Sequence, residues 1–146
     1  TLMFDLDAIE NNPISVFNKE DADKFVNLYG AIPVENSKDV KKHSEAIITE
    51  WKKRKISFID NPTVSMINAF LHAPEDSSVF VGHAGVLVKE KDGFLFIEKY
   101  GLSLPYQASK FKDKEEVKKY LMDRLDVNSA DNGASKPIIM ENDKLM

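Results

Sequence analysis

The chain of 146 residues contains no cysteine. This absence excludes disulfide bonds, thiolate zinc sites and a cysteine nucleophile from these residues. It does not by itself identify the cellular compartment. Any thiol chemistry that the protein performs would therefore need a cysteine from outside this sequence.

Long apolar runs and a strong excess of one charge are also missing. The longest strongly apolar runs, such as Val79 to Val88, are far too short to cross a bilayer. No basic stretch followed by an apolar core, as in a secretory signal, opens the chain. The 24 acidic and 20 basic residues give no reason to expect binding to nucleic acid or to anionic lipid. No HExxH motif, paired metal-ligand spacing or glycine-rich phosphate loop occurs, so we expect no metal and no other cofactor.

The composition is that of a globular protein, with 42% apolar and 30% charged residues. No linker rich in proline or glycine divides the chain, so we expect a single domain over residues 1–146. The sequence begins at Thr1 rather than at methionine, and Phe4-Asp5-Leu6-Asp7 starts as if in mid-domain. We therefore expect this domain to be the C-terminal part of a longer protein.

Three segments carry apolar residues at helical spacing. Asn18 is the expected cap of the first helix and Gly30 its stop, Ser37 caps the second, and Asp113 and Glu116 have capping-box spacing in the third. The apolar faces consist of Phe25, Leu28 and Tyr29, then Val40, Ile47, Ile48 and Trp51, then Val117, Tyr120, Leu121 and Leu125. We expect Trp51 to lie in the core.

The clearest strands are Val79 to Val88 and Phe94 to Tyr100, which a polar turn joins into a hairpin. The first of these is apolar on both faces, which predicts a central strand covered on each side. We also predict a short strand at Ile56 to Ile59 and a last edge strand at Pro137 to Met140. For Thr63 to Leu71 a helix is favoured over a strand. Helices mostly precede the hairpin and one follows it, so the fold class is α+β.

The three histidines have different contexts. His43 lies in a charged helical stretch, which predicts an exposed side chain, and His72 ends an apolar run, which predicts a loop or capping role. His83 lies inside the first hairpin strand between Gly82 and Gly85, where backbone or a ligand can approach closely. A buried histidine needs a partner for its ring nitrogens. His83 is therefore the candidate functional histidine.

Glu98, on the second hairpin strand, is the expected partner of His83. A four-residue loop at Lys89 to Asp92 places the two directly opposite each other, whereas a two-residue Asp92-Gly93 turn leaves them on one face but roughly 13 Å apart. A five-residue loop puts them on opposite faces. A carboxylate that holds an imidazole in one tautomer is the base and orienter half of a catalytic triad. In the alternative, His83 is a core histidine bonded to a backbone carbonyl and Glu98 is exposed.

The segment Val81-Gly82-His83-Ala84-Gly85-Val86-Leu87-Val88, followed after the turn by Phe94-Leu95-Phe96-Ile97-Glu98, resembles the histidine hairpin of CHAP and NlpC/P60-type domains. Those domains are papain-like bacterial cysteine peptidases or amidases that act on cell-wall peptides. The resemblance implies a papain-like half-barrel with His83 as general base and Glu98 as its orienter. Tyr100, Tyr106 and Gln107 follow the second strand and are candidate substrate-binding residues, although aromatic side chains there more often close a core.

Four segments together resemble an uncharacterised bacterial family of putative lipoproteins, domain-of-unknown-function family 4300: Leu2 to Asp7, Ser65 to Leu71, the hairpin, and Pro105 to Ala108. This resemblance implies an extracytoplasmic protein of the cell envelope. It implies membrane attachment only through a lipid anchor outside this chain. It also implies an upstream Asn-Cys-Arg segment, which would supply the nucleophile.

We therefore expect part of a papain-like amidase or peptidase whose cysteine lies outside this chain, with cell-wall peptide or glycan as partner. As it stands, the chain is not competent for thiol catalysis. The alternatives are a non-catalytic domain that binds a peptide or glycan, and a structural accessory domain without a ligand. The hydrolase requires His83 and Glu98 close together on one face and opening into a cleft, whereas the binding domain requires only the cleft.

Overall fold

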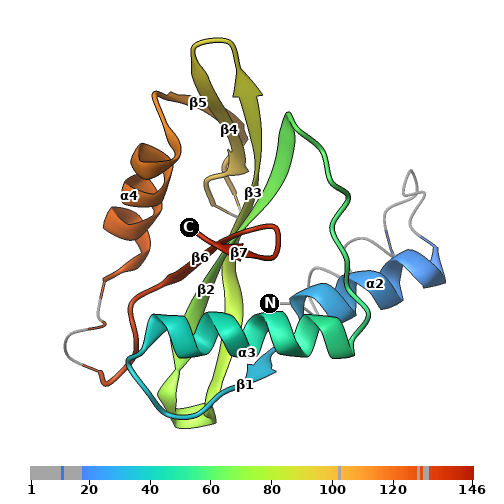
Figure 1. Cartoon of the computed structure of the whole chain (residues 1–146), viewed down its shortest axis with the longest axis vertical. Coiled ribbons are helices and arrows are strands. Elements are labelled where there is room, and N and C mark those ends of the chain that lie inside the picture. The colour runs from blue at the N-terminus through green and yellow to red at the C-terminus, as the bar shows by residue number, and fades with distance from the viewer. Residues whose placement is uncertain (1–10, 12–17, 102, 128, 130–131) are drawn as a thin grey trace.

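A computed structural model describes residues 11, 18–101, 103–127, 129 and 132–146. Over these residues the chain forms three α-helices and a seven-stranded antiparallel sheet that is not closed into a barrel (Figure 1). The expected α+β class is confirmed. The N-terminal segment, residues 2–7, lies outside the described residues.

The strands follow the order β5-β4-β3-β2-β6-β7, and β1 pairs with β3. β3 is central, as expected, since it lies between β4 and β2. The described elements in chain order are α2 (Lys19–Tyr29), β1 (Ile32–Pro33), α3 (Val40–Lys53), β2 (Val64–Ala73), the 3-10 helix η1 (Pro74–Asp76), β3 (Ser78–Glu90), β4 (Gly93–Lys99), β5 (Tyr106–Phe111), α4 (Lys114–Leu125), β6 (Ile138–Glu141) and β7 (Lys144–Leu145).

All three predicted helices form, and two of their caps are those expected. The Asn18 side chain accepts a hydrogen bond from the Asp21 N–H at 3.0 Å, and Asp113 accepts one from the Glu116 N–H at 3.0 Å. The predicted Ser37 cap is wrong. Asp39 caps α3 instead, because its carboxylate accepts from two first-turn N–H groups, while the Ser37 hydroxyl accepts from the Asp39 N–H one step upstream.

The helix expected over residues 63–71 is wrong, because this segment forms β2. β2 pairs with β3 over its whole length and with β6 over Ile67 to Phe70. The β6 partner is distant in sequence, so local periodicity could not show the pairing. Tertiary context of this kind routinely overrides local propensity.

Two further strand predictions need correction. Residues 56–59 form no strand: Ile56 and Phe58 pack against the core beside α3, while Ile59 points into solvent. These residues follow Lys55, whose positive φ of 60° turns the chain away from the helix. The strand at Pro137 to Met140 is confirmed as β6, but it is not an edge strand, since it lies between β2 and β7.

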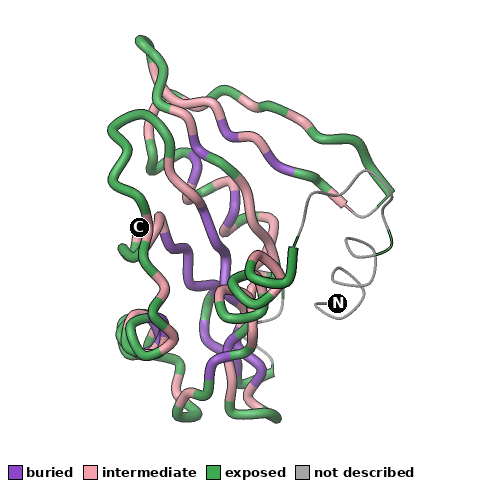
Figure 2. Tube along the Cα trace, turned by 90° about the vertical axis from the view of Figure 1, so that its right-hand side faces the viewer, coloured by how far each residue is buried: buried purple, intermediate pink, exposed green. Residues whose placement is uncertain are grey.

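Helices cover the two faces of the sheet and bury a core on each side. On one face, Ile47 and Trp51 of α3 pack with Phe70, Ile138 and neighbouring residues, and α2 adds Leu28. On the other face, α4 packs on Ile67, Leu87 and Phe96 through Val117 and Leu121. Figure 2 shows the buried residues along the middle of the strands. Trp51 is buried, as expected, and its indole N–H donates to the Leu28 carbonyl at 3.2 Å.

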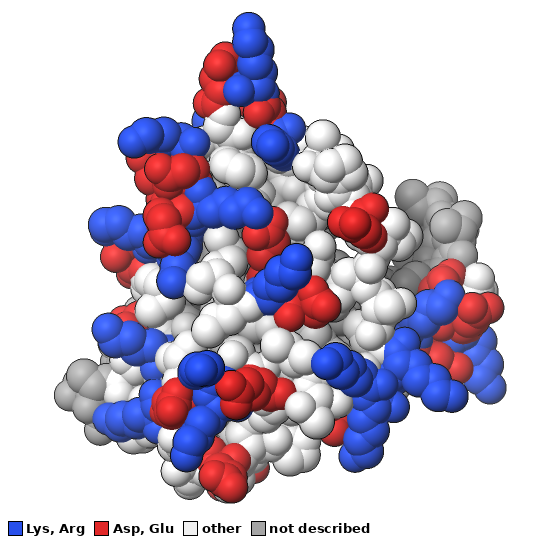
Figure 3. Space-filling model, in the orientation of Figure 1, with Lys and Arg blue, Asp and Glu red and all other residues white. Residues whose placement is uncertain are grey.

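The surface carries interspersed charges of both signs. In the view of Figure 3, basic and acidic side chains alternate over the helices and the hairpin without forming a patch of one sign. Within the described ranges, no helix is long and apolar enough to cross a membrane.

Candidate functional site

His83 lies on β3 at a β-bulge. The pairing of β2 with β3 shifts between Ala69 and Phe70, so that Gly82 is the extra residue and His83 pairs with Ala69. A bulge of this kind redirects the side chains next to it. A Cβ atom on Gly82 would come within 2.4 Å of Leu71. The space beside this glycine is therefore filled by a neighbouring side chain of the sheet.

The hairpin adopts a register that the sequence did not predict. Glu90 pairs with Gly93 and Gly85 pairs with Glu98, so the loop consists of Lys91 and Asp92 alone. None of the three expected loops is present. His83 is two positions from the residue opposite Glu98, which keeps both side chains on one face as diagonal neighbours. Long side chains can span a diagonal separation, and the side chains of His83 and Glu98 are in hydrogen-bond contact.

The Glu98 carboxylate accepts hydrogen bonds from four side chains. Its Oε2 atom accepts from Nε2 of His83 and from Nη1 of Arg124, the latter at 2.7 Å. Its Oε1 atom accepts from the Tyr120 hydroxyl and from Nε2 of Gln107, the latter at 3.1 Å. The Glu98 side chain is 0% exposed and that of His83 is 11% exposed. Side chains from β3, β5 and α4 thus converge on one buried acid of β4.

These donors decide the charge of Glu98. Burial alone raises the pKa of the carboxyl group, because a low-dielectric interior penalises the charged form. The hydrogen bonds from Tyr120, His83 and Gln107 act in the opposite sense, and together they hold the pKa of Glu98 below its ordinary value. Glu98 is therefore a carboxylate at neutral pH.

The carboxylate also fixes the tautomer of His83. An ionised carboxylate only accepts hydrogen bonds, so Nε2 of His83 carries a hydrogen and donates it. In the neutral ring the lone pair then resides on Nδ1, which forms no hydrogen bond within the described part of the chain. The pair therefore presents an oriented imidazole with one basic nitrogen available.

The three predicted substrate-binding residues have different positions. Gln107 lies opposite Glu98 in the β4–β5 pairing and bonds to it directly. Tyr100 reaches the site only through Arg124, whose guanidinium lies 3.8 Å from the Tyr100 ring centre and donates to the Tyr100 carbonyl. Tyr106 is 75% exposed and makes no polar contact with the pair. Neither tyrosine closes the core.

Tyr120 and Arg124 belong to the site, and sequence reasoning missed them. They lie four residues apart on α4, a spacing that places both on one helical face. The sequence predicts Tyr120 on the apolar face of this helix, so the spacing indicates that Arg124 lies on the same inner side. The spacing does not show that α4 packs over the hairpin, so it could not connect these two residues with Glu98.

The other two histidines are buried, whereas an exposed side chain was predicted for His43 and a loop or capping role for His72. His43 lies in the first turn of α3 and faces the sheet. His72 lies on β2 rather than in a loop. A charged helical stretch still has an inner face, and His43 occupies it. Among the described residues no group of three or more His, Cys, Asp or Glu side chains is placed to hold a metal.

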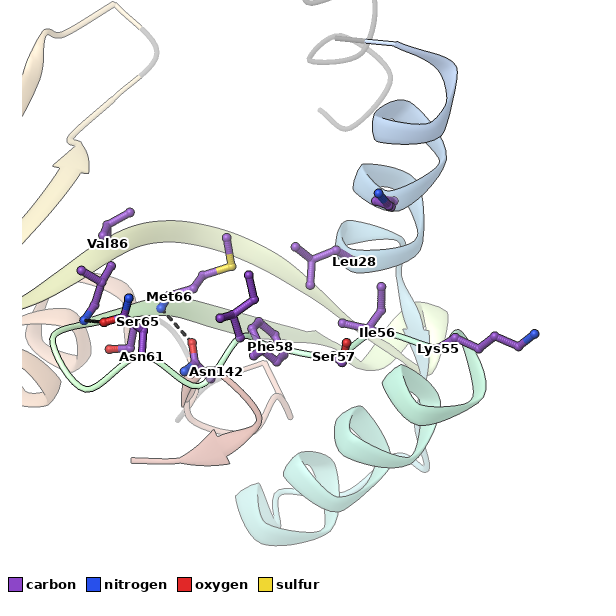
Figure 4. Close-up of a pocket in the computed structure, with 13 residues that line it drawn as sticks. Leu28, Lys55, Ile56, Ser57, Phe58, Asn61, Ser65, Met66, Val86 and Asn142 are labelled. Atoms are coloured by element: carbon purple, nitrogen blue, oxygen red, sulfur yellow. Dashed lines mark hydrogen bonds between the residues drawn. The ribbon is translucent and has the colours of Figure 1, made fainter.

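An apolar cleft of about 510 Å³ lies on the face of the sheet opposite to His83 and Glu98 (Figure 4). Its lining includes Leu28 of α2, Ile56 and Phe58 of the following segment, Met66 of β2 and Val86 of β3. Val86 alternates with Gly85 and Leu87, which puts this cleft on the side of α2 and α3. The cleft therefore does not adjoin His83 and Glu98.

A family model matches the whole chain, residues 1–146, and its description is "Domain of unknown function (DUF4300)". No curated protein and no solved structure matches the chain.

Proposed function

Because this chain belongs to the family described as a domain of unknown function, DUF4300, we propose its function from the site alone: His83 and Glu98 are the base and the orienting carboxylate of a papain-like amidase or peptidase. The observation that carries this proposal is the bond from His83 Nε2 to a wholly buried carboxylate. The nucleophile is a cysteine outside residues 1–146, since these contain none.

The proposed chemistry follows from the tautomer of His83. Nδ1 takes the proton of the cysteine thiol, and the thiolate attacks the amide carbonyl carbon. The amine leaves with the proton returned from the imidazolium, and a thioester remains. Water, activated by the same Nδ1 atom, then hydrolyses the thioester. Glu98 stays ionised throughout and stabilises the imidazolium that forms twice in the cycle.

Two features support a reactive pair over a purely structural one. Arg124 alone would neutralise the charge of Glu98, yet His83 shares the same carboxylate oxygen. In addition, Nδ1 of His83 forms no hydrogen bond with any described residue, which leaves this atom available to a thiol. We further propose, from the family resemblance, a papain-like arrangement, a cell-wall peptide as substrate, and an extracytoplasmic location with a lipid anchor outside this chain.

The first experiment is a thiol measurement on the full-length protein from its native source. Intact mass and N-terminal sequencing show whether a cysteine lies outside these residues. If it does, we expect its alkylation by iodoacetamide at neutral pH to be at least about tenfold slower in His83→Asn than in wild type, because a thiol without its base partner is mostly protonated. Glu98→Gln should slow alkylation as well, since the tautomer is no longer fixed.

Lys99→Gln is the matched control, because Lys99 is the exposed neighbour of Glu98 on the same strand. It should alkylate at the wild-type rate. A full-length protein without cysteine would end the proposal, as would a thiol whose alkylation rate does not respond to His83.

A second candidate is non-catalytic binding of a peptide. The apolar cleft on the face opposite to His83 favours this candidate. Leu28, Phe58 and Met66 line the cleft, and such a lining binds the apolar side chains of a peptide better than it binds a glycan. The absence of a cysteine from the full-length protein would make this candidate the better one.

A further inference from the structure

Two buried histidine rings meet beneath the start of α3. His43, on α3, is 1% exposed, and His72, near the end of β2, is 7% exposed. Their ring centres lie 4.5 Å apart in an edge-to-face arrangement. Both rings bond to Ser135, in the segment that leads into β6: the Ser135 hydroxyl lies 3.2 Å from His43 Nδ1, and the Ser135 N–H donates to His72 Nδ1 at 3.0 Å.

The partners fix the tautomers of both neutral rings. His72 Nδ1 accepts from a backbone N–H, so the hydrogen of this ring is on Nε2, which is buried and has no partner among the described residues. His43 Nε2 lies 3.3 Å from the Glu35 carbonyl, which can only accept, so its Nδ1 atom accepts from the Ser135 hydroxyl. The arrangement therefore fits two neutral imidazoles.

Protonation affects the two rings differently. If His43 gains a proton on Nδ1, the Ser135 hydroxyl can turn and donate instead to the Lys136 carbonyl, 3.0 Å away. If His72 gains a proton on Nδ1, two donors face each other, because the backbone N–H of Ser135 cannot turn. The buried charge then has no acceptor at that atom. Buried, unpaired charges are among the most costly groups in a protein interior.

The charged groups around the pair do not remove this cost. Asp39, which caps α3, and Glu75, on η1, each favour a protonated ring. Burial has the larger effect and lowers the pKa of both histidines, and a charge on His43 lowers the pKa of His72 further. Glu35, Lys42 and Glu45 line the surface cleft beside His43.

We propose that Ser135, His43 and His72 form an acid-sensitive latch, in which protonation of His72 releases the 134–137 segment and loosens β6 from β2 and α3. β6 lies between β2 and β7, and it contributes Ile138 and Met140 to one core and Ile139 to the other. Release of its leading segment therefore affects both faces of the sheet. The latch is independent of the proposed catalytic pair.

The sign of the pH effect follows from the lowered pKa values. The unfolded chain binds a proton near the ordinary histidine value of 6.5, whereas the latched state resists protonation until lower pH. The latch is therefore fully stable above about pH 6.5 and weakens as the pH falls toward the folded-state value.

The test is amide hydrogen exchange of the full chain between about pH 7.5 and pH 5, corrected for the intrinsic pH dependence of exchange. We expect the opening constant at Ser135 and at Ile138 to Met140 to rise by up to about tenfold per pH unit below pH 6.5. His72→Asn keeps an acceptor oxygen for the Ser135 N–H but does not titrate, so its opening constant should stay flat. His43→Gln should retain most of the acid response.

An equal acid response in wild type and His72→Asn would overturn the proposal, as would a wild-type segment that stays closed at pH 5. Ring titration by NMR of the wild type covers the case in which the variant does not fold. A His72 ring that protonates at its ordinary pKa while the Ser135 amide stays protected would equally overturn it.

Discussion

Glu98 is an acid whose fully buried side chain accepts hydrogen bonds from four side-chain donors. Its replacement by glutamine keeps the shape but removes the charge that Arg124 and His83 share. We expect Glu98→Gln to lower the free energy of unfolding at neutral pH by about 3 kcal/mol, because Arg124, a partly buried cation, is left without its anion. Urea denaturation followed by circular dichroism measures this loss.

The pH dependence of that loss identifies its origin. The folded-state pKa of Glu98 lies below its ordinary value of 4.5, so its contribution is present above about pH 4.5 and disappears as the pH falls through the lower folded-state pKa. The gap between wild type and Glu98→Gln should therefore narrow in acid. Glu115→Gln, at an exposed position of α4, is the control and should stay within about 0.5 kcal/mol of wild type. A gap that is independent of pH would contradict the charge argument.

The sequence predicted the partner of His83 but not how the two meet. The four-residue loop, the two-residue turn and the observed register all place His83 and Glu98 on one face, since strand side chains alternate with a period of two. The distance between His83 and Glu98 depends on the length of the hairpin loop. The loop residues Lys91 and Asp92 include no glycine that would mark the turn in the sequence. His43 was missed for a different reason, because a polar helical stretch does not show which of its residues faces inward.

At the scale of elements, the helices were predictable and the pairing of β2 was not. Caps and apolar periodicity are local signals, and α2 and α4 follow them closely. β2 owes its extended form to β3 on one side and β6 on the other. β6 lies some seventy residues away, so no window along the sequence could contain both.

Gly85 joins two elements at the site. A Cβ atom there would lie 2.5 Å from two ring carbons of Phe96 and 2.8 Å from the Ile97 carbonyl oxygen. We expect Gly85→Ala to lower the free energy of unfolding by about 1–3 kcal/mol, because overpacking outweighs the smaller gain from reduced chain entropy. Urea denaturation measures the loss.

In Gly85→Ala, displacement of the Phe96 ring should also disturb the contacts of Glu98, because Gly85 pairs with Glu98. Gly101→Ala is the matched control, since its Cβ would meet Leu104 only at an ordinary 3.6 Å. It should remain within about 0.5 kcal/mol of wild type. Equal stability of Gly85→Ala and Gly101→Ala would show that the β3–β4 contact is looser than the structure describes.

For the whole molecule, one sheet serves two cores. β2 gives Ile67 and Ala69 to the face under α4 and Phe70 to the face under α3. β6 is divided in the same way, with Ile138 and Ile139 on opposite sides. Since the strands are common to both cores, loss of packing on one face removes the support of the other. The two faces should therefore unfold in one cooperative transition.

Leu121→Ala tests this coupling, because Leu121 of α4 is fully buried on one face of the sheet, while the only tryptophan, Trp51 of α3, is buried on the other. We expect a loss of about 2–5 kcal/mol from the cavity that the substitution leaves. The loss should appear as the same shift of the urea midpoint by Trp51 fluorescence, which senses only the opposite face, and by far-ultraviolet circular dichroism. Ile59→Ala, at an exposed position, is the control and should move neither midpoint. A Trp51 midpoint that stays at its wild-type value in Leu121→Ala would mean that the sheet separates two independently stable halves.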